Sequence, residues 1–207
     1  MCGEYGCAAG LNVTASHNPP EYNGYKVYWS DGAQLPPQHA AAIAAQMEQL
    51  DVFDDIQPLA YEAALEKGLI TLMGKETDDK FLAHVLAQIN DKASVAKVAD
   101  TFTMVYTPFH GTGYQQIPYV LGELGIRHLH CVPEQMVIDG TFPTVKSPNP
   151  ETPESFALAL DLAKKSTPTS SSALTPTPTA WPSRSRTRPA STSKFPATRR
   201  ACCCWTI

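Results

Sequence analysis

The sequence lacks several features that mark membrane, exported and metal-binding proteins. No run of apolar residues approaches the ~20 that a membrane-spanning helix needs. The first four residues, MCGE, lack the basic and then apolar pattern of an export signal. The six cysteines, at positions 2, 7, 131 and 202–204, have the spacing of neither a metal site nor a disulfide framework. We therefore expect a cytoplasmic protein with reduced thiols and no membrane partner.

Acidic residues are missing from the end of the chain. All 20 Asp and Glu lie in 1–165 together with 10 Lys or Arg, a net charge of −10. Residues 166–207 hold six Lys or Arg and no acid, so they carry +6, and the two sums give the overall −4. This change in charge marks a boundary near residue 165.

The basic end segment is also low in complexity, with 23 Ser, Thr or Pro among its 42 residues. As protein sequence, that composition predicts disorder. A nucleic-acid-binding or membrane-binding tail is an alternative interpretation. The acidic body of the chain would repel a polyanion, so we expect no nucleic-acid partner.

Hydrophobic periodicity in the first hundred residues alternates between strand and helix patterns. Proline opens one predicted helix and Gly68 ends another, as these residues commonly do. We expect strands at 11–13 and 25–29 and helices at 38–50, 61–67 and 81–90, the last of them capped by residues 77–80.

From about residue 101 the pattern becomes strand, loop, helix and strand, over 102–106, 107–113, 117–124 and 127–132. This is a βαβ unit, which predicts a parallel, buried sheet. A proline-rich loop and a helix over 154–165 follow. The expected fold class is α/β, with mixed sheets covered by helices.

Two loops contain residue types that often act in catalysis or in phosphate binding. Residues 14–26, TASHNPPEYNGYK, join the two N-terminal strands, and their proline and Asn-Gly pairs fix the bends. Such a loop holds Ser16 out from the sheet, where His17 and Lys26 approach from either side. The spacing alone also fits an ordinary polar loop, because short motifs arise often by chance.

The second loop, TPFHGTG at 107–113, places glycines after a strand, where backbone N–H groups can bind phosphate. It matches neither the dinucleotide nor the Walker pattern, so a structural turn is favoured. We expect His110 to hydrogen-bond within this loop rather than to take part in chemistry.

TASHNP followed by NGYK resembles the active-site serine loop of the α-D-phosphohexomutase family, and the similarity continues through VYWSDGAQ. YTPFHGTG, VPEQ, DGTFPTV and PNPE resemble the second domain of its phosphoglucomutase branch. The resemblance implies a partial domain I at 1–98 and a partial domain II at 99–165, with the low-complexity tail at 166–207. The family's remaining domains have no counterpart in this sequence.

The resemblance implies an isomerase that interconverts glucose 1-phosphate and glucose 6-phosphate through a phosphoserine and a sugar bisphosphate. Ser16 would carry the phosphoryl group, while His17 and Lys26 would supply proton transfer and positive charge. Phosphomannomutase or phosphopentomutase activity, or a non-catalytic phosphosugar-binding fragment, are the alternatives. A sugar phosphate is the expected partner, and the oligomeric state stays open.

The resemblance further implies Mg²⁺, held by the phosphate on Ser16 and by three aspartates of an Asp-x-Asp-x-Asp-Arg loop that this sequence lacks. Codons for residues 175–181, started one base earlier, permit Asp-Pro-Asp-Ala-Asp-Arg-Met, and those for 202–206 force Leu-Leu-Leu-Asp. Both resemble the family sequence. We expect the tail to be a frameshifted reading, and the chain as written to have little or no mutase activity.

Overall fold

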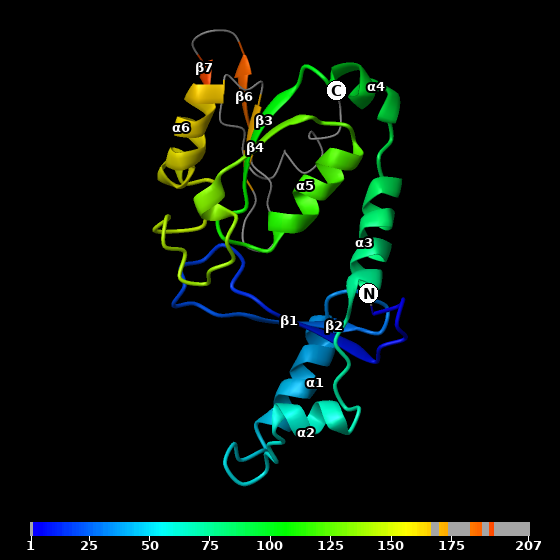
Figure 1. The fold of residues 1–207 in the computed structure, drawn as a ribbon. Coiled ribbons are helices and arrows are strands. Elements are labelled where there is room, and N and C mark those ends of the chain that lie inside the picture. Colours follow the sequence, from blue (N-terminus) through cyan, green and yellow to red (C-terminus); the bar gives the residue numbers. More distant parts are fainter. Residues whose placement is uncertain (1, 167–169, 174–182, 188–190, 193–207) are drawn as a thin grey trace. The chain divides into compact units, whose positions relative to one another are not determined.

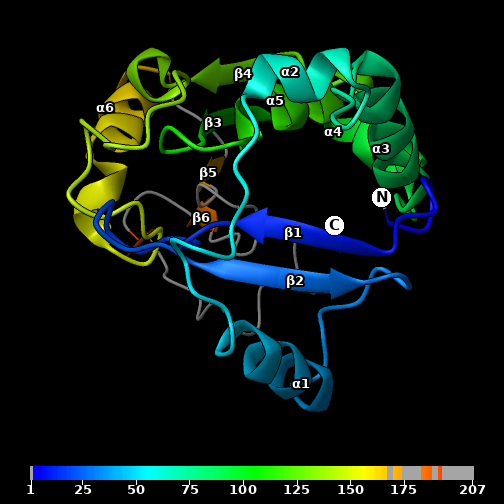
Figure 2. The same cartoon turned by 90° about the horizontal axis from the view of Figure 1, so that it is seen from below.

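A computed structural model describes residues 2–166, 170–173, 183–187 and 191–192. Figures 1 and 2 present its helices and strands from two directions. The chain forms two compact units, the first made of residues 1–12 and 25–81 and the second of residues 13–24 and 82–207.

The first unit contains a two-stranded sheet and the helices that follow it. Strands β1 (Ala9–Val13) and β2 (Tyr25–Trp29) pair and run in opposite directions (Figure 2). Helix α1 (Pro37–Met47) begins at a proline, whose fixed φ suits a first turn. Helix α2 (Tyr61–Glu66) ends just before Gly68, which has a φ of 67°. These four elements confirm the predicted strands and helices, apart from shifts of a few residues at their ends.

One face of this sheet is apolar and exposed. A Cβ atom on Gly10 would lie 3.5 Å from the Cβ of Tyr28, so these two residues share a face. Alternation along each strand then puts Leu11 and Trp29 on the opposite face, where they are 61% and 42% exposed. Among the described residues of this unit, Ala64 is the one buried hydrophobic side chain.

The prediction for the next two helices was partly wrong. Helix α3 (Lys75–Ala87) begins well before residue 81, so residues 77–80 lie inside it and do not cap it. Acidic side chains in its first turn favour this start, and Thr77 is 9% exposed with its hydroxyl 2.6 Å from that of Tyr5. Helix α4 (Lys92–Val98) was not predicted, although Asp91 caps it by accepting a hydrogen bond from the Ser94 N–H.

The second unit is organised around strand β3 (Thr103–Thr107), which lies between two parallel neighbours. Strand β4 (His128–Cys131) pairs with one edge and β5 (Ser170–Ala173) with the other. Antiparallel strands β6 (Ser183–Thr187) and β7 (Ser191–Thr192) extend the sheet beyond β5.

Helix α5 (Gly113–Glu123) connects β3 to β4 and so confirms the predicted βαβ unit. It begins at Gly113 rather than residue 117, because the chain turns directly from the loop into the helix. Pro118 therefore lies inside the helix, where its missing N–H costs one helical hydrogen bond. Gly125, with a φ of 82°, follows the end of this helix.

Two hydrophobic clusters cover the two faces of β3. Val105 packs with Phe109 and Phe156 on one face, and Met104 packs with Leu121 on the other. The first cluster is covered by α6 (Ala157–Ser166), which follows the 3₁₀ turn η2 (Pro153–Phe156). Helices α6 and α5 lie on opposite sides of the strands (Figure 1). This layering confirms the α/β fold class with sheets covered by helices.

The predicted domain boundaries, 98/99 and 165/166, stay predictions. Strands β5 to β7 fall within the segment 166–207, and the second-unit sheet therefore includes part of the predicted tail. Residues 175–181 and 202–206, which carry the frameshift prediction, lie outside the described residues.

Candidate functional site

The loop that contains Ser16 is closed at its base by a backbone hydrogen bond. The N–H of Thr14 donates to the carbonyl oxygen of Gly24 at 2.9 Å, directly beyond the paired strands. A Cβ atom on Gly24 would lie only 2.1 Å from that Thr14 backbone oxygen. Only glycine therefore fits at this position without moving the backbone.

Inside the loop, hydrogen bonds between near neighbours form successive turns. The Asn18 N–H donates to the Ala15 carbonyl at 3.2 Å, and the Tyr22 N–H donates to the Pro19 carbonyl at 3.0 Å. The Asn23 side chain accepts from the N–H of the glycine that follows it. The turn from Pro19 to Tyr22 lies at the predicted proline pair, whereas the turn from Ala15 to Asn18 precedes it and no turn lies at Asn23-Gly24. The sequence therefore predicted only part of the shape of the loop.

Ser16 adopts a left-handed backbone conformation, with a φ of 60°. A non-glycine residue in this region is uncommon and often occurs at functional sites. The Ser16 N–H donates to Thr14 Oγ1 at 3.0 Å, which holds this conformation. Ser16 Oγ lies 3.2 Å from His17 Nδ1, and both residues are half-buried. The structure thus brings together two of the three predicted catalytic residues, a hydroxyl and a potential base.

Lys26, the third predicted residue, lies on β2 in the first unit and is half-buried. The catalytic roles of Ser16, His17 and Lys26 stay predictions. Within the described ranges, no group of three or more His, Cys, Asp or Glu residues could hold a metal ion.

Bonds within the loop at 107–113 and bonds to residues beyond it both hold this segment. Within the loop, the Phe109 N–H donates to Thr107 Oγ1 at 3.1 Å. His110 is 3% exposed, and its ring lies 2.9 Å from the Val137 carbonyl oxygen and 2.8 Å from Thr144 Oγ1. These partners lie outside the loop itself, which corrects the expectation of bonds within it. Gln135 and Thr144 lie in the family-like phrases VPEQ and DGTFPTV, but the sequence analysis assigned them no role, because no local pattern predicts a contact between separate loops.

Burial changes the acidity of two groups beside this loop. Burial raises the pKa of the Tyr106 phenol well above its ordinary value. The phenol O–H donates a hydrogen bond to the Gly113 carbonyl oxygen at 3.0 Å. Burial likewise raises the pKa of the Cys131 thiol, so this residue is a poor thiolate nucleophile. Neither group fits a catalytic role.

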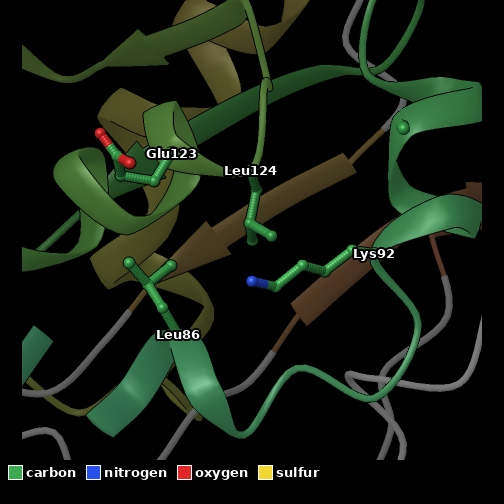
Figure 3. A pocket seen from close by; sticks show the side chains of 5 residues that line it. Leu86, Lys92, Glu123 and Leu124 are labelled. Carbon is green, nitrogen blue, oxygen red and sulfur yellow. The ribbon is translucent and has the colours of Figure 1, made fainter. Parts of the chain in front are cut away.

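A surface pocket of about 270 Å³ lies elsewhere in the second unit (Figure 3). Leu86, Ala96 and Leu124 supply its apolar lining, and Lys92 and Glu123 supply its charges. Its lining includes no serine, threonine or cysteine and none of the predicted catalytic residues, so it is not the candidate site.

Models of known protein families match the chain in two places. The model described as phosphoglucomutase/phosphomannomutase, alpha/beta/alpha domain I, matches residues 1–52, and that for domain II matches residues 79–175. The chain belongs to the phosphoglucomutase/phosphomannomutase family. The serine loop lies within the domain I match, and β3, α5, β4 and the His110 loop lie within the domain II match.

Individual members of the phosphoglucomutase/phosphomannomutase family agree. A phosphoglucomutase of Staphylococcus haemolyticus is 35% identical over 156 residues, which are 75% of this chain. A phosphoribomutase of Saccharomyces cerevisiae is 35% identical over 173 residues, 76% of the chain. The match spans 27% of the length of each relative.

A solved structure supports the fold. A phosphoglucomutase/phosphomannomutase family protein from Burkholderia thailandensis superposes with a TM-score of 0.56 at 19% identity, over 86% of this chain and 34% of its own. In the described part of the chain, no helix is long and apolar enough to cross a membrane.

Proposed function

We propose that the chain carries the phosphoryl-transfer serine of a phosphohexomutase. Ser16 accepts a phosphoryl group from a sugar bisphosphate and returns one to a sugar monophosphate. The observation that supports this most directly is the 3.2 Å contact between Ser16 Oγ and His17 Nδ1, on a closed loop of a family member. A serine hydroxyl by itself is a weak nucleophile, and a neighbouring base that takes its proton activates it.

The proposed transfer step conserves protons and electron pairs. As Ser16 Oγ attacks phosphorus, its O–H bond breaks and the proton moves to His17 Nδ1. The bond between phosphorus and the sugar oxygen breaks, and that oxygen keeps the electron pair and takes a proton from water, while His17 later gives the serine proton back to solvent. Lys26 is proposed to offset the negative charge of the phosphoryl oxygens.

The Mg²⁺ ion that the family resemblance implies fits poorly. The phosphate on Ser16 is one expected ligand, but the last acidic residue of the sequence is Asp161, and the described residues contain no cluster of metal ligands. We assign no step to the ion. We infer that the chain as written interconverts sugar phosphates slowly or not at all.

Glucose phosphate is the proposed substrate, because the phrases YTPFHGTG and VPEQ resemble the phosphoglucomutase branch and one relative bears that name. Mannose or pentose phosphates are the alternatives, and another relative is named a phosphoribomutase. A cytoplasmic location and the absence of nucleic-acid and membrane partners stay predictions.

A non-catalytic phosphosugar-binding fragment is the second candidate function. The missing aspartates favour it, since a phosphorylated serine can persist on a chain that does not complete the reaction cycle.

The test is phosphoryl transfer to Ser16. We expect glucose 1,6-bisphosphate to add one phosphoryl group to the chain, detected by intact mass and located at Ser16 by peptide mapping. Ser16→Ala should remove the label, and His17→Phe should slow its formation at least tenfold. Label at another serine, or none on the wild-type chain, would refute the proposed function.

A further inference from the structure

Two adjacent residues at the end of β3 have left-handed backbones. Phe109 has a φ of 48° and His110 a φ of 64°, conformations that are unfavourable for residues with a Cβ atom. Contacts hold both in place. The Phe109 ring packs edge-on against that of Phe156, with centroids 5.5 Å apart. The His110 N–H donates to the Gln135 carbonyl at 3.0 Å.

Beneath this turn, a fully buried threonine and glutamine form hydrogen bonds in a fixed direction. The Phe109 N–H donates to Thr107 Oγ1 at 3.1 Å, so the Thr107 hydroxyl proton is free to donate to Gln135 Oε1, 2.5 Å away. The Gln135 amide nitrogen, which belongs to the 3₁₀ turn η1 (Pro133–Gln135), then donates to Thr144 Oγ1 at 3.0 Å.

The direction of these bonds fixes the proton on the His110 ring. Nδ1 lies 2.9 Å from the carbonyl oxygen of Val137, which can only accept, so Nδ1 carries the proton. Nε2 of a neutral ring must then accept from the Thr144 hydroxyl, 2.8 Å away. Thr144 accepts from Gln135 and donates to His110. In this arrangement every donor in the series faces an acceptor.

Asp139 is a charged residue near this ring. Its pKa is held below the ordinary value first by the Thr141 hydroxyl and then by the Thr141 N–H, both of which donate hydrogen bonds to its carboxylate. The Asp139 N–H also donates to the His110 carbonyl at 3.3 Å. The segment from Met136 to Val145 is thus attached to the end of β3 through both the backbone and the ring of His110.

We propose that Thr107, His110, Gln135 and Thr144 form a hydrogen-bond clamp that fixes His110 as the Nδ1–H tautomer. The clamp holds residues 136–145 at the end of β3. In Figures 1 and 2 the loop between β1 and β2 lies beside the chain that joins β4 to η2, which includes this segment. A further part of the inference rests on the proposed function: the clamp residues are positioning residues for phosphoryl transfer at Ser16.

The first test is the tautomer, measured on the wild-type chain at neutral pH. Long-range ¹H–¹⁵N correlation spectra distinguish protonated from unprotonated imidazole nitrogens, and His110→Asn identifies the His110 signals. We expect a proton on Nδ1 and an unprotonated, hydrogen-bonded Nε2. A proton on Nε2, or on both nitrogens, would overturn the clamp.

The second test uses a matched pair of substitutions at Thr144. Thr144→Val removes the hydroxyl and keeps the shape of the side chain, whereas Thr144→Ser keeps the hydroxyl. We expect Thr144→Val to speed amide hydrogen exchange at Asp139 and Val145 about five- to tenfold, as loss of one or two hydrogen bonds should. Thr144→Ser should stay within about twofold of wild type. Equal exchange in the two variants would refute the clamp.

The positioning role is tested by the rate at which glucose 1,6-bisphosphate labels Ser16. We expect Thr144→Val to lower this rate and Thr144→Ser to rescue it, with the tautomer signal following the same order. If the wild-type chain is never labelled, the proposed function fails while the spectra still decide the clamp. If labelling is equal in both variants, the positioning role is refuted and the function stands.

Discussion

At the scale of the residue, the serine loop depends on Gly24, because a side chain at this position would collide with the Thr14 backbone. Gly24→Ala should push the Thr14 carbonyl away, open the base of the loop and misplace Ser16. We expect the free energy of unfolding to fall by about 1–3 kcal/mol, as for other overpacked sites, and the labelling of Ser16 to fall at least tenfold. Urea denaturation and intact mass measure the two effects.

Gly122→Ala is the matched control, because a Cβ atom there meets nothing within 4 Å and the residue lies in α5. It should leave Ser16 labelling unchanged and stabilise the chain by up to about 1 kcal/mol, since alanine favours a helix. Normal labelling of Gly24→Ala would contradict the close contact described above.

The residues of the serine loop were predictable because they are neighbours in sequence. The 3.2 Å contact of Ser16 with His17 joins adjacent residues, and the proline pair lies in the turn from Pro19 to Tyr22. The contact of His110 with Thr144 joins residues 34 apart in two loops. No local pattern predicts such a pair, because tertiary packing alone brings it together.

At the scale of the element, the edge-on pair of Phe109 and Phe156 attaches η2 and α6 to the sheet. Phe156 is fully buried, so Phe156→Ala should lower the free energy of unfolding by about 3–5 kcal/mol through lost burial and the cavity left behind. Phe53, 92% exposed, supplies the control, and Phe53→Ala should change stability by less than about 0.5 kcal/mol. Comparable urea midpoints for the two variants would show that this contact contributes little.

Periodicity predicted most elements, and the errors occurred where local signals compete. The apolar spacing from residue 81 marks the second half of α3, while Lys75 to Lys80 are too polar to show a stripe, so the start was placed too late. Helix α4 has 7 residues, which is too short for apolar spacing to reveal it, and Asp91 is its one local signal. Helix α5 was predicted from residue 117, yet it begins at Gly113 and contains Pro118.

At the scale of the whole molecule, activity should depend on residues that this reading of the gene does not supply. We expect little or no turnover of glucose 1-phosphate in a coupled assay with the chain as written. A gene with the frame restored and the family's remaining domains should be active, because aspartates then surround the phosphate on Ser16. Sequencing the DNA that encodes residues 160–207 is the direct measurement. An alternate frame without the aspartate triplet would end the frameshift explanation.

The parallel pairing of β3 has a consequence for how the chain is made. Met104 pairs with Ser170, so the ribosome must add 66 further residues before that partner exists. At typical synthesis rates of 5–20 residues per second, this takes roughly 3–13 s. Until then one edge of β3, most of whose side chains are buried in the folded protein, has no neighbour on the nascent chain. A chaperone that binds emerging apolar segments would have this interval in which to act.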